Sequence, residues 1–300
     1  KDLDWNEKKS NIKNYKLSEL IYWFKTPQKY WLNKKNILPK EIFIHNPDEE
    51  YVSNFQKSQI ISKIIHELEI DNLNIIEDLK NLNISHLLAD NGIIMPKNSF
   101  YTKEKEIKEL LNSLCSNLSQ HNKINRIYVK SNSNKEEFFV TDDTVIELIH
   151  GKLSLSRLTE SWIKLLFISS LKKNIKKTKL IFRAENHYKS QIMQSPGTID
   201  SNLILEEYIN IFKNFSEKCL PLPPESTYKY VEAKIKSRNE KKAFKDQWIG
   251  NKTFSKGERD NIVMKICFGN EKEPGFFFRN NNFDKLSFRL YGPLIKALKK

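Results

Sequence analysis

The sequence KLSELIYWFKTPQKYWL (Lys16–Leu32) decides the fold class of this 300-residue chain. Its first half places Leu17, Leu20 and Phe24 at the spacing that puts apolar side chains on one face of a helix. Its second half begins at Pro27, and proline is favoured at the first position of a helix because it lacks an N–H group that would stay unpaired there. The threonine before this proline is a suitable helix cap. The stretch therefore predicts two short consecutive helices that share one buried surface.

The spacing of apolar residues divides the rest of the chain into a helical portion (residues 1–120) and an α/β portion (residues 121–300). After residue 120 the period changes from 3.6 to 2, which indicates strands. Strands that alternate with helices predict a small α/β core. The predicted helices cover residues 52–69, 75–88, 103–118, 156–171, 201–219, 227–248 and 283 onward, and the predicted strands cover 124–129, 137–140, 145–149, 179–183 and 275–279.

The charge of the chain favours an acidic partner. The formal net charge is +14, which suits nucleic acid, although only seven of the basic residues are arginine and the abundance of Lys, Asn and Ile is typical of an AT-rich genome. A dense lysine run and one C-terminal arginine are the candidate phosphate contacts, and a solvated loop would explain the run equally well. These residues are Lys172, Lys173, Lys176, Lys177, Lys179 and Arg279.

A metal-dependent nuclease with an α/β core needs an Asp on one core strand and an acidic-x-Lys triplet on the next. The carboxylates hold Mg²⁺ and the lysine orients the attacking water. Asp142 and Asp143 lie between two predicted strands, where aspartate is a favoured turn residue. Two positions after Glu147 stands Ile149, not lysine. We therefore interpret this segment as a hairpin turn.

An alternative metal site would combine Asp200 with Glu232 and Lys234, since Glu232-Ala233-Lys234 spells acidic-x-Lys. However, residues 227–248 predict a charged, solvent-facing helix in which such a triplet is common. Asp200 precedes the helix predicted from Ser201, where aspartate is a frequent N-cap. The chain has no GxxxxGK[ST] phosphate loop and no dinucleotide fingerprint, and we expect no cofactor and no resident metal.

The cysteine pattern and the hydropathy fit a protein of the reducing cytoplasm. Three widely spaced cysteines form no CxxC pair, so neither a disulfide framework nor a zinc knuckle is expected. No run of 18 apolar residues occurs, and we expect no membrane partner and a cytoplasmic location.

An ordered series of motifs resembles the C-terminal nuclease-like domain of the RecC family, the gamma subunits of exodeoxyribonuclease V. The opening helices are similar to the start of that domain, although Thr26 stands where His is common and His150 stands where Pro is common. The other matching motifs, in order, are SHLLADNGIIMP (85–96), Gly151-Lys152-Leu153 with a Trp-bearing helix, KLIFR (179–183), LPLPPE (220–225), Trp248-Ile249-Gly250 and Gly257-Glu258-Arg259-Asp260.

The resemblance implies a restriction-endonuclease-like α/β core with a large N-terminal helical portion and a degenerate catalytic site. It further implies a non-catalytic domain that handles DNA ends and separated strands and docks RecB-like and RecD-like helicase subunits. An active Mg²⁺-dependent nuclease using Asp200, Glu232 and Lys234 is the alternative. A protein-interaction module whose charge reflects genome composition is a third hypothesis.

Overall fold

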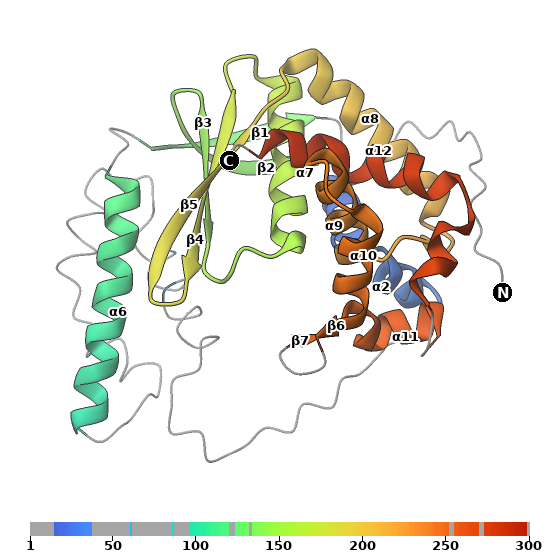
Figure 1. The fold of residues 1–300 in the computed structure, drawn as a ribbon. Helices are drawn as coiled ribbons and strands as arrows, with labels where there is room; N and C mark the ends of the chain where they lie inside the picture. Colours follow the sequence, from blue (N-terminus) through green and yellow to red (C-terminus); the bar gives the residue numbers. More distant parts are fainter. Residues whose placement is uncertain are drawn as a thin grey trace.

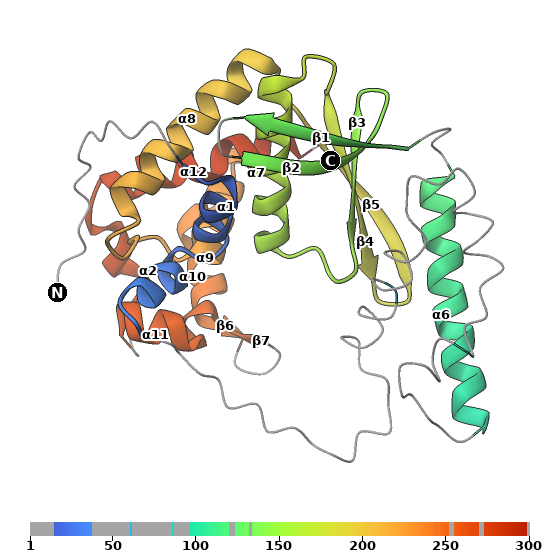
Figure 2. The same cartoon turned by 180° about the vertical axis from the view of Figure 1, so that it is seen from behind.

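The computed structural model describes residues 15–37, 61, 86, 97–119, 124–131, 134–251, 255–269 and 273–298. The helices predicted over 52–69 and 75–88 fall outside the described residues, apart from two single positions. Within the described part, a five-stranded mixed sheet has helices on both sides, and a second group of helices lies beyond the helices on one of those sides (Figures 1 and 2).

The strands of the sheet lie side by side in chain order. Only β3 and β4 are parallel, and a parallel pair needs a crossover connection, which the long helix α7 between them supplies. The strands predicted in residues 124–183 are all present, whereas β5 was not predicted. The elements are β1 (Asn125–Ser131), β2 (Asn134–Thr141), β3 (Thr144–Ile149), α7 (Leu155–Leu171), β4 (Lys177–Ala184) and β5 (His187–Gln194).

The sheet is weakly joined between β2 and β3. Only three residue pairs, from Phe139↔Ile146 to Thr141↔Thr144, connect these two strands next to their turn. By contrast, seven pairs join β1 to β2 and six join β3 to β4. The β2 and β3 strands therefore separate beyond these pairs, and we call this opening the seam.

Helices lie on both sides of the sheet. On one face α7 packs against β3 and β4, and it is in turn covered by α1 (Leu17–Lys25) and α8 (Thr198–Phe215). On the other side α6 (Lys97–Leu118) lies along β5, where the Asn117 amide donates to the Tyr188 carbonyl at 3.3 Å. The helix predicted over 103–118 is therefore confirmed and begins earlier.

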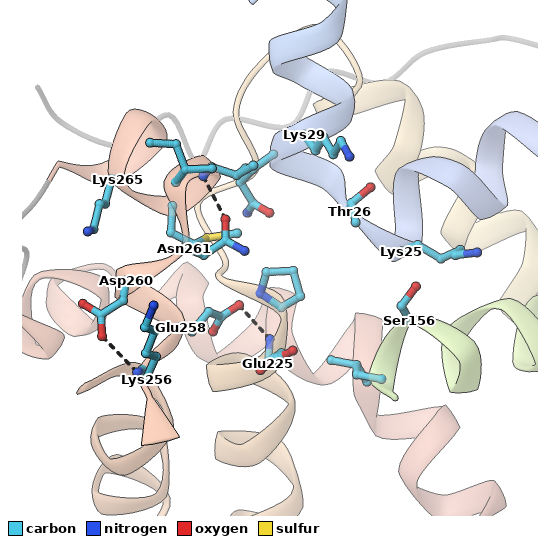
Figure 3. A pocket seen from close by; sticks show the side chains of 17 residues that line it. Lys25, Thr26, Lys29, Ser156, Glu225, Lys256, Glu258, Asp260, Asn261 and Lys265 are labelled. Carbon is cyan, nitrogen blue, oxygen red and sulfur yellow. Dashed lines mark hydrogen bonds between the residues drawn. The ribbon is translucent and has the colours of Figure 1, made fainter. Parts of the chain in front are cut away.

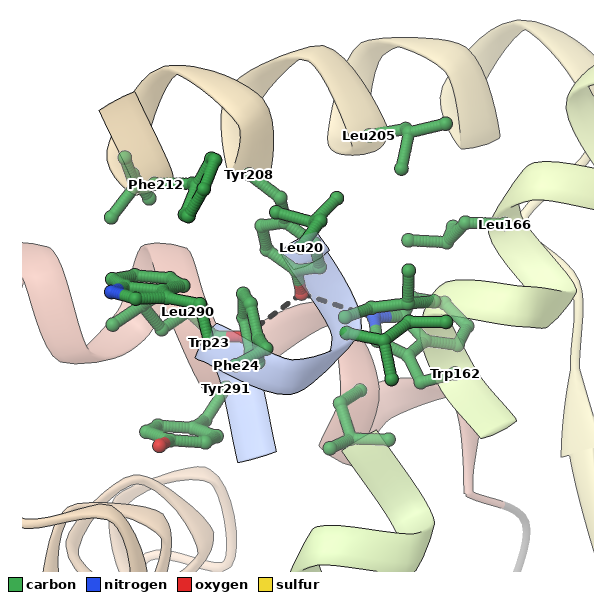
Figure 4. Packing of buried hydrophobic residues seen from close by; sticks show 14 of the residues in the cluster. Leu20, Trp23, Phe24, Trp162, Leu166, Leu205, Tyr208, Phe212, Leu290 and Tyr291 are labelled. Atoms are coloured by element: carbon green, nitrogen blue, oxygen red, sulfur yellow. Dashed lines mark hydrogen bonds between the residues drawn. The ribbon is translucent and has the colours of Figure 1, made fainter. Parts of the chain in front are cut away.

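The two opening helices form as predicted and lie in the core. Leu17, Leu20 and Phe24 of α1 are all buried, and full burial of such a side chain is worth about 1.5–3 kcal/mol. Pro27 is the first residue of α2 (Pro27–Lys34), but the Thr26 side chain does not cap this helix. Its hydroxyl donates instead to the carbonyl of Tyr22 at 3.4 Å, so the capping prediction was wrong. Figure 4 shows α1 packed among side chains of α7, α8 and α12.

The C-terminal helices surround an aromatic cluster. The helix predicted over 227–248 is in fact two helices, because the chain turns at Ser237 with a φ of 52°. The predicted strand over 275–279 is a 3-10 helix that starts at Pro274 and buries Phe277 against Phe244 and Trp248. The elements are α9 (Pro224–Ile235), α10 (Glu240–Ile249), β6 (Gly250–Asn251), β7 (Ser255–Lys256), η1 (Glu258–Asp260), α11 (Ile262–Phe268), η2 (Pro274–Arg279) and α12 (Asn282–Ala297).

Gly257 brings together two motifs that are separate in the sequence, Trp248-Ile249-Gly250 and Gly257-Glu258-Arg259-Asp260. Strands β6 and β7 form a small hairpin that brings Gly257 against the end of α10. A Cβ atom on Gly257 would lie 2.3 Å from the carbonyl carbon of Ile249 and 2.3 Å from the carbonyl oxygen of Trp248. Only a residue without a side chain fits there. Glu258 then turns inward, and its carboxylate accepts hydrogen bonds from the first turn of α9.

Candidate nucleic-acid interface

Most of the predicted lysine run forms a loop between α7 and β4, which we call the basic loop (residues 172–176), and Lys177 and Lys179 lie in β4. Lys172, Lys173 and Lys176 are exposed on it, and Ile175 anchors it to the core. A loop that presents three lysine ammonium groups to solvent is suited to contact phosphates.

The turn between β2 and β3 supports the basic loop. Asp142 and Asp143 form this turn, as predicted, and Asp142 adopts a positive φ of 47°. The Asp143 carbonyl accepts a hydrogen bond from the Lys176 N–H at 2.8 Å, and its carboxylate lies 3.7 Å from the Lys177 ammonium. A hydrogen bond from Thr144 and the nearby lysines hold the pKa of Asp143 below its ordinary value. The two aspartates therefore fix the loop and do not form a metal site.

Lys179 does not belong to the exposed group. Its side chain is 7% exposed and crosses to α6, where the ammonium donates to the Asn117 carbonyl at 3.0 Å. Burial lowers the pKa of Lys179 from its ordinary value. The residue follows the alternation of β4, which turns it toward α6, so it ties two elements together and cannot contact phosphate.

Arg279 is exposed, as its proposed role requires, but it lies at the end of η2 and not in a strand. Its guanidinium lies 5.8 Å from the centre of the Phe276 ring. The structure thus assigns Arg279 to the C-terminal helices, whereas the basic loop belongs to the sheet.

Beneath β3, four charged side chains form an ion-pair chain that the sequence analysis missed. Lys25 of α1 lies 2.6 Å from Glu160 of α7, Glu160 lies 3.1 Å from Lys164, and Lys164 lies 3.8 Å from Glu147 of β3. The i,i+4 pairing of Glu160 with Lys164 on a predicted helix was a usable signal. The other two contacts join residues far apart in the sequence, so no local pattern indicates them.

Burial in the seam affects the pKa values of both carboxyl groups in the ion-pair chain. Burial raises the pKa of Glu147, and the nearby Lys164 ammonium opposes that rise. Burial also opposes ionisation of Glu160, but hydrogen bonds from Lys25 and Lys164 outweigh it and lower the pKa of Glu160. Each carboxylate at this position thus has a lysine as its counter-ion.

The seam contains a cavity of about 300 Å³ lined by residues of β2, β3, β4 and α7. Thr178 and His150 line it, and neither the Thr178 Oγ1 nor the His150 Nδ1 has a hydrogen-bond partner among the described residues. Burial lowers the pKa of His150 to about 4, so this imidazole is neutral at physiological pH. The seam is therefore lined by apolar side chains together with polar and charged ones of both signs.

The structure does not bring the residues of the alternative metal site together. Glu232 lies on α9 and bonds to Lys229 and Lys236 at 2.9 and 2.6 Å, while Lys234 forms an ion pair with Asp284 at 2.8 Å. The prediction of a charged, solvated helix face is confirmed. Asp200 lies in the first turn of α8, whose cap is Gly197, so the N-cap interpretation of Asp200 was wrong.

Across the described residues, no three Asp, Glu, His or Cys side chains are grouped so that they could hold a metal ion. In the same part of the chain, no helix combines the length and apolar character needed to cross a membrane. No protein-family model matches the sequence, and no curated protein matches it significantly.

Proposed function

We propose that this chain is a non-catalytic, DNA-handling and subunit-docking domain with a restriction-endonuclease-like core, of the kind found in the RecC-like gamma subunits of exodeoxyribonuclease V. The order of elements supports this proposal. The opening helices α1 and α2 and the helix α6 precede a three-stranded antiparallel meander, which is followed by a crossover helix and a strand parallel to the third. Such a core would place catalytic carboxylates on β2 and β3.

The ion-pair chain is the single observation that best supports the proposed loss of catalysis. Where a nuclease would need carboxylates open to Mg²⁺, Glu147 and Glu160 face the ammonium groups of Lys164 and Lys25. Ile149, the residue two positions after Glu147, is buried and apolar and cannot orient water. The position therefore supports the fold and supplies no metal ligands.

The DNA-handling role is supported by the basic loop. Lys172, Lys173 and Lys176 are exposed at the C-terminal end of α7, where they can contact phosphates without sequence preference. The proposed docking of RecB-like and RecD-like helicase subunits rests on the resemblance of the sequence motifs alone. A domain with this function would act in double-strand break repair and homologous recombination.

The test combines binding and cleavage on the purified chain. A labelled forked duplex and its single strands are incubated with the protein, with and without Mg²⁺ or Mn²⁺. We expect binding that weakens steeply with salt and no cleavage above a buffer control. Cleavage that a chelator and Glu147→Gln both abolish would overturn the non-catalytic role. Cleavage that Glu232→Ala abolishes would instead support the alternative nuclease, and the absence of DNA binding would favour the interaction module.

A further inference from the structure

A groove lies at the N-terminal end of α7. It has a volume of about 1050 Å³ and is formed by the ends of α1, α2, α7, α9 and α11 together with the segment that follows β7. Figure 3 shows lysines at several sides of it: Lys25 and Lys29 on one wall, Lys256 on the floor and Lys265 on the opposite wall.

Three of these lysines are available to a ligand. Lys29 and Lys256 are exposed and Lys265 is half-buried, and none of the three has a carboxylate partner within the described residues. Lys25 differs from them because it belongs to the ion-pair chain through Glu160. Three cationic groups from three different elements therefore face one groove.

The carboxylates of the groove already have donors. Glu258 is buried and accepts from the N–H groups of Glu225 and Ser226 at 3.0 and 2.7 Å. Asp260 accepts from the Gly257 N–H at 3.1 Å, and the Glu225 carboxylate accepts from the Gln247 amide at 2.9 Å. These bonds hold the acids in place and fix their positions relative to Lys29, Lys256 and Lys265, which have no such carboxylate contact in the described part of the chain.

The helix ends add to the positive potential. The first turns of α2, α7 and α9 all line the groove, and the N-terminal end of a helix carries a partial positive charge. At α9 the first-turn N–H groups of Glu225 and Ser226 already donate to the Glu258 carboxylate. The positive potential of the groove therefore comes mainly from the lysines of the other walls and from the N-terminal end of α7.

We infer that this groove binds the sugar–phosphate backbone of a single nucleic-acid strand through Lys29, Lys256 and Lys265, an inference that rests on the proposed DNA-handling function. No aromatic side chain lines the groove, and its apolar walls come from Leu155 and the first turns of α11. Stacking of bases is therefore absent, and recognition through phosphates has no sequence preference.

The groove and the basic loop are independent sites. They lie at opposite ends of α7, whose 17 residues span about 25 Å at 1.5 Å per residue. This separation exceeds the Debye length of about 8 Å at physiological ionic strength. A change of charge at one site will therefore not weaken binding at the other through space.

The experiment measures fluorescence anisotropy of a labelled 20-nucleotide oligothymidylate with the full chain over a series of salt concentrations. The groove variant carries Lys29→Glu, Lys256→Glu and Lys265→Glu. A control variant with the same net charge carries three changes at exposed lysines elsewhere: Lys189→Glu, Lys242→Glu and Lys285→Glu. A third variant places arginine at the three groove positions, and circular dichroism melting checks that all of them fold.

We expect the groove variant to bind at least about tenfold more weakly than the control variant and the arginine variant to bind like the wild type. Loss of three phosphate contacts should also lower the slope of log K against log salt by about 2. Equal binding by the groove and control variants would overturn the groove site, and weakened binding by Lys172→Glu, Lys173→Glu and Lys176→Glu would then leave the proposed function standing. A wild-type chain that binds no strand would overturn both.

Discussion

The indole N–H of Trp162 donates a hydrogen bond of 3.0 Å to the hydroxyl of Tyr208, and both side chains are completely enclosed in the core. The Tyr208 hydroxyl donates in turn to the carbonyl of Leu290 at 2.8 Å (Figure 4). One hydroxyl group thus joins α7, α8 and α12, and it satisfies two polar groups that have no access to water.

Tyr208→Phe tests this junction. The substitution leaves the Trp162 N–H and the Leu290 carbonyl without this partner in a buried position, and each such group costs about 1–3 kcal/mol. We expect the free energy of unfolding to fall by about 2–4 kcal/mol in urea denaturation. Tyr128→Phe is the matched control, since Tyr128 is 56% exposed and should show almost no change. Equal effects at both positions would contradict the role of the hydroxyl.

Gly257→Ala tests the contact between the two motifs at the end of α10. The new methyl group would overlap the backbone of Trp248 and Ile249, so either α10 or the segment after β7 must move. We expect a loss of about 3 kcal/mol or more and a clear fall in Tm. Gly275→Ala is the control, because a Cβ at Gly275 meets no atom within 4 Å. A Gly257→Ala variant as stable as this control would contradict the close approach.

Glu258 predicts a pH dependence of stability. Burial raises the pKa of its carboxyl from 4.5 to about 7, so the folded protein binds a proton that the unfolded chain has released between these two pH values. Stability must therefore decrease as pH rises from about 4.5 to 7 and then level off, by roughly 3 kcal/mol for this group.

The measurement compares urea denaturation of the wild type and Glu258→Gln at pH 5 and pH 8. The amide cannot ionise, so the variant should lose less stability than the wild type between the two pH values. An identical pH dependence in both proteins would show that Glu258 is not the titrating group.

Lys164→Met tests the ion-pair chain of the seam. The change removes the cation that faces Glu147 while Glu160 keeps Lys25, and a partly buried carboxylate without its partner is destabilising by about 2–4 kcal/mol. We expect Glu147→Gln to recover most of that loss in the double variant. Lys229→Met is the control, because its partner Glu232 lies on a solvated helix and such pairs contribute less than about 1 kcal/mol. Additive effects of the two seam changes would contradict direct coupling.

The parts of the fold with strong local patterns could be predicted from the sequence. The apolar stripe of α1, the proline at the start of α2 and the uninterrupted apolar face of α7 each indicated their element correctly. Strand β5 was missed because its sequence, HYKSQIMQ, does not alternate apolar and polar residues: its two buried side chains, Tyr188 and Met193, are five positions apart and therefore lie on opposite faces of the strand. Such an edge strand is recognised only through its neighbour β4.

The candidate site could be predicted only in part, because its geometry depends on contacts between distant segments. The exposure of the basic loop followed from its composition, but the burial of Lys179 depends on α6, which packs beside β4 and β5. In the same way, Lys25 and Glu160 are 135 residues apart in the sequence and meet only when α1 packs on α7. Local pattern gives the elements, and tertiary packing decides which charges meet.

The short ladder between β2 and β3 has a consequence for the hydration of the molecule. Beyond the three pairs next to the turn, the backbone N–H and C=O groups of these strands that face the seam have no ladder partner across it. Backbone groups without a ladder partner can take their hydrogen bonds from water, and the cavity of about 300 Å³ beside them has room for it. Amide hydrogens along the seam should then exchange with deuterium earlier than those between β3 and β4. The sheet would then open and close as two parts, β1–β2 and β3–β5, which are hydrogen-bonded to each other only next to the turn between β2 and β3.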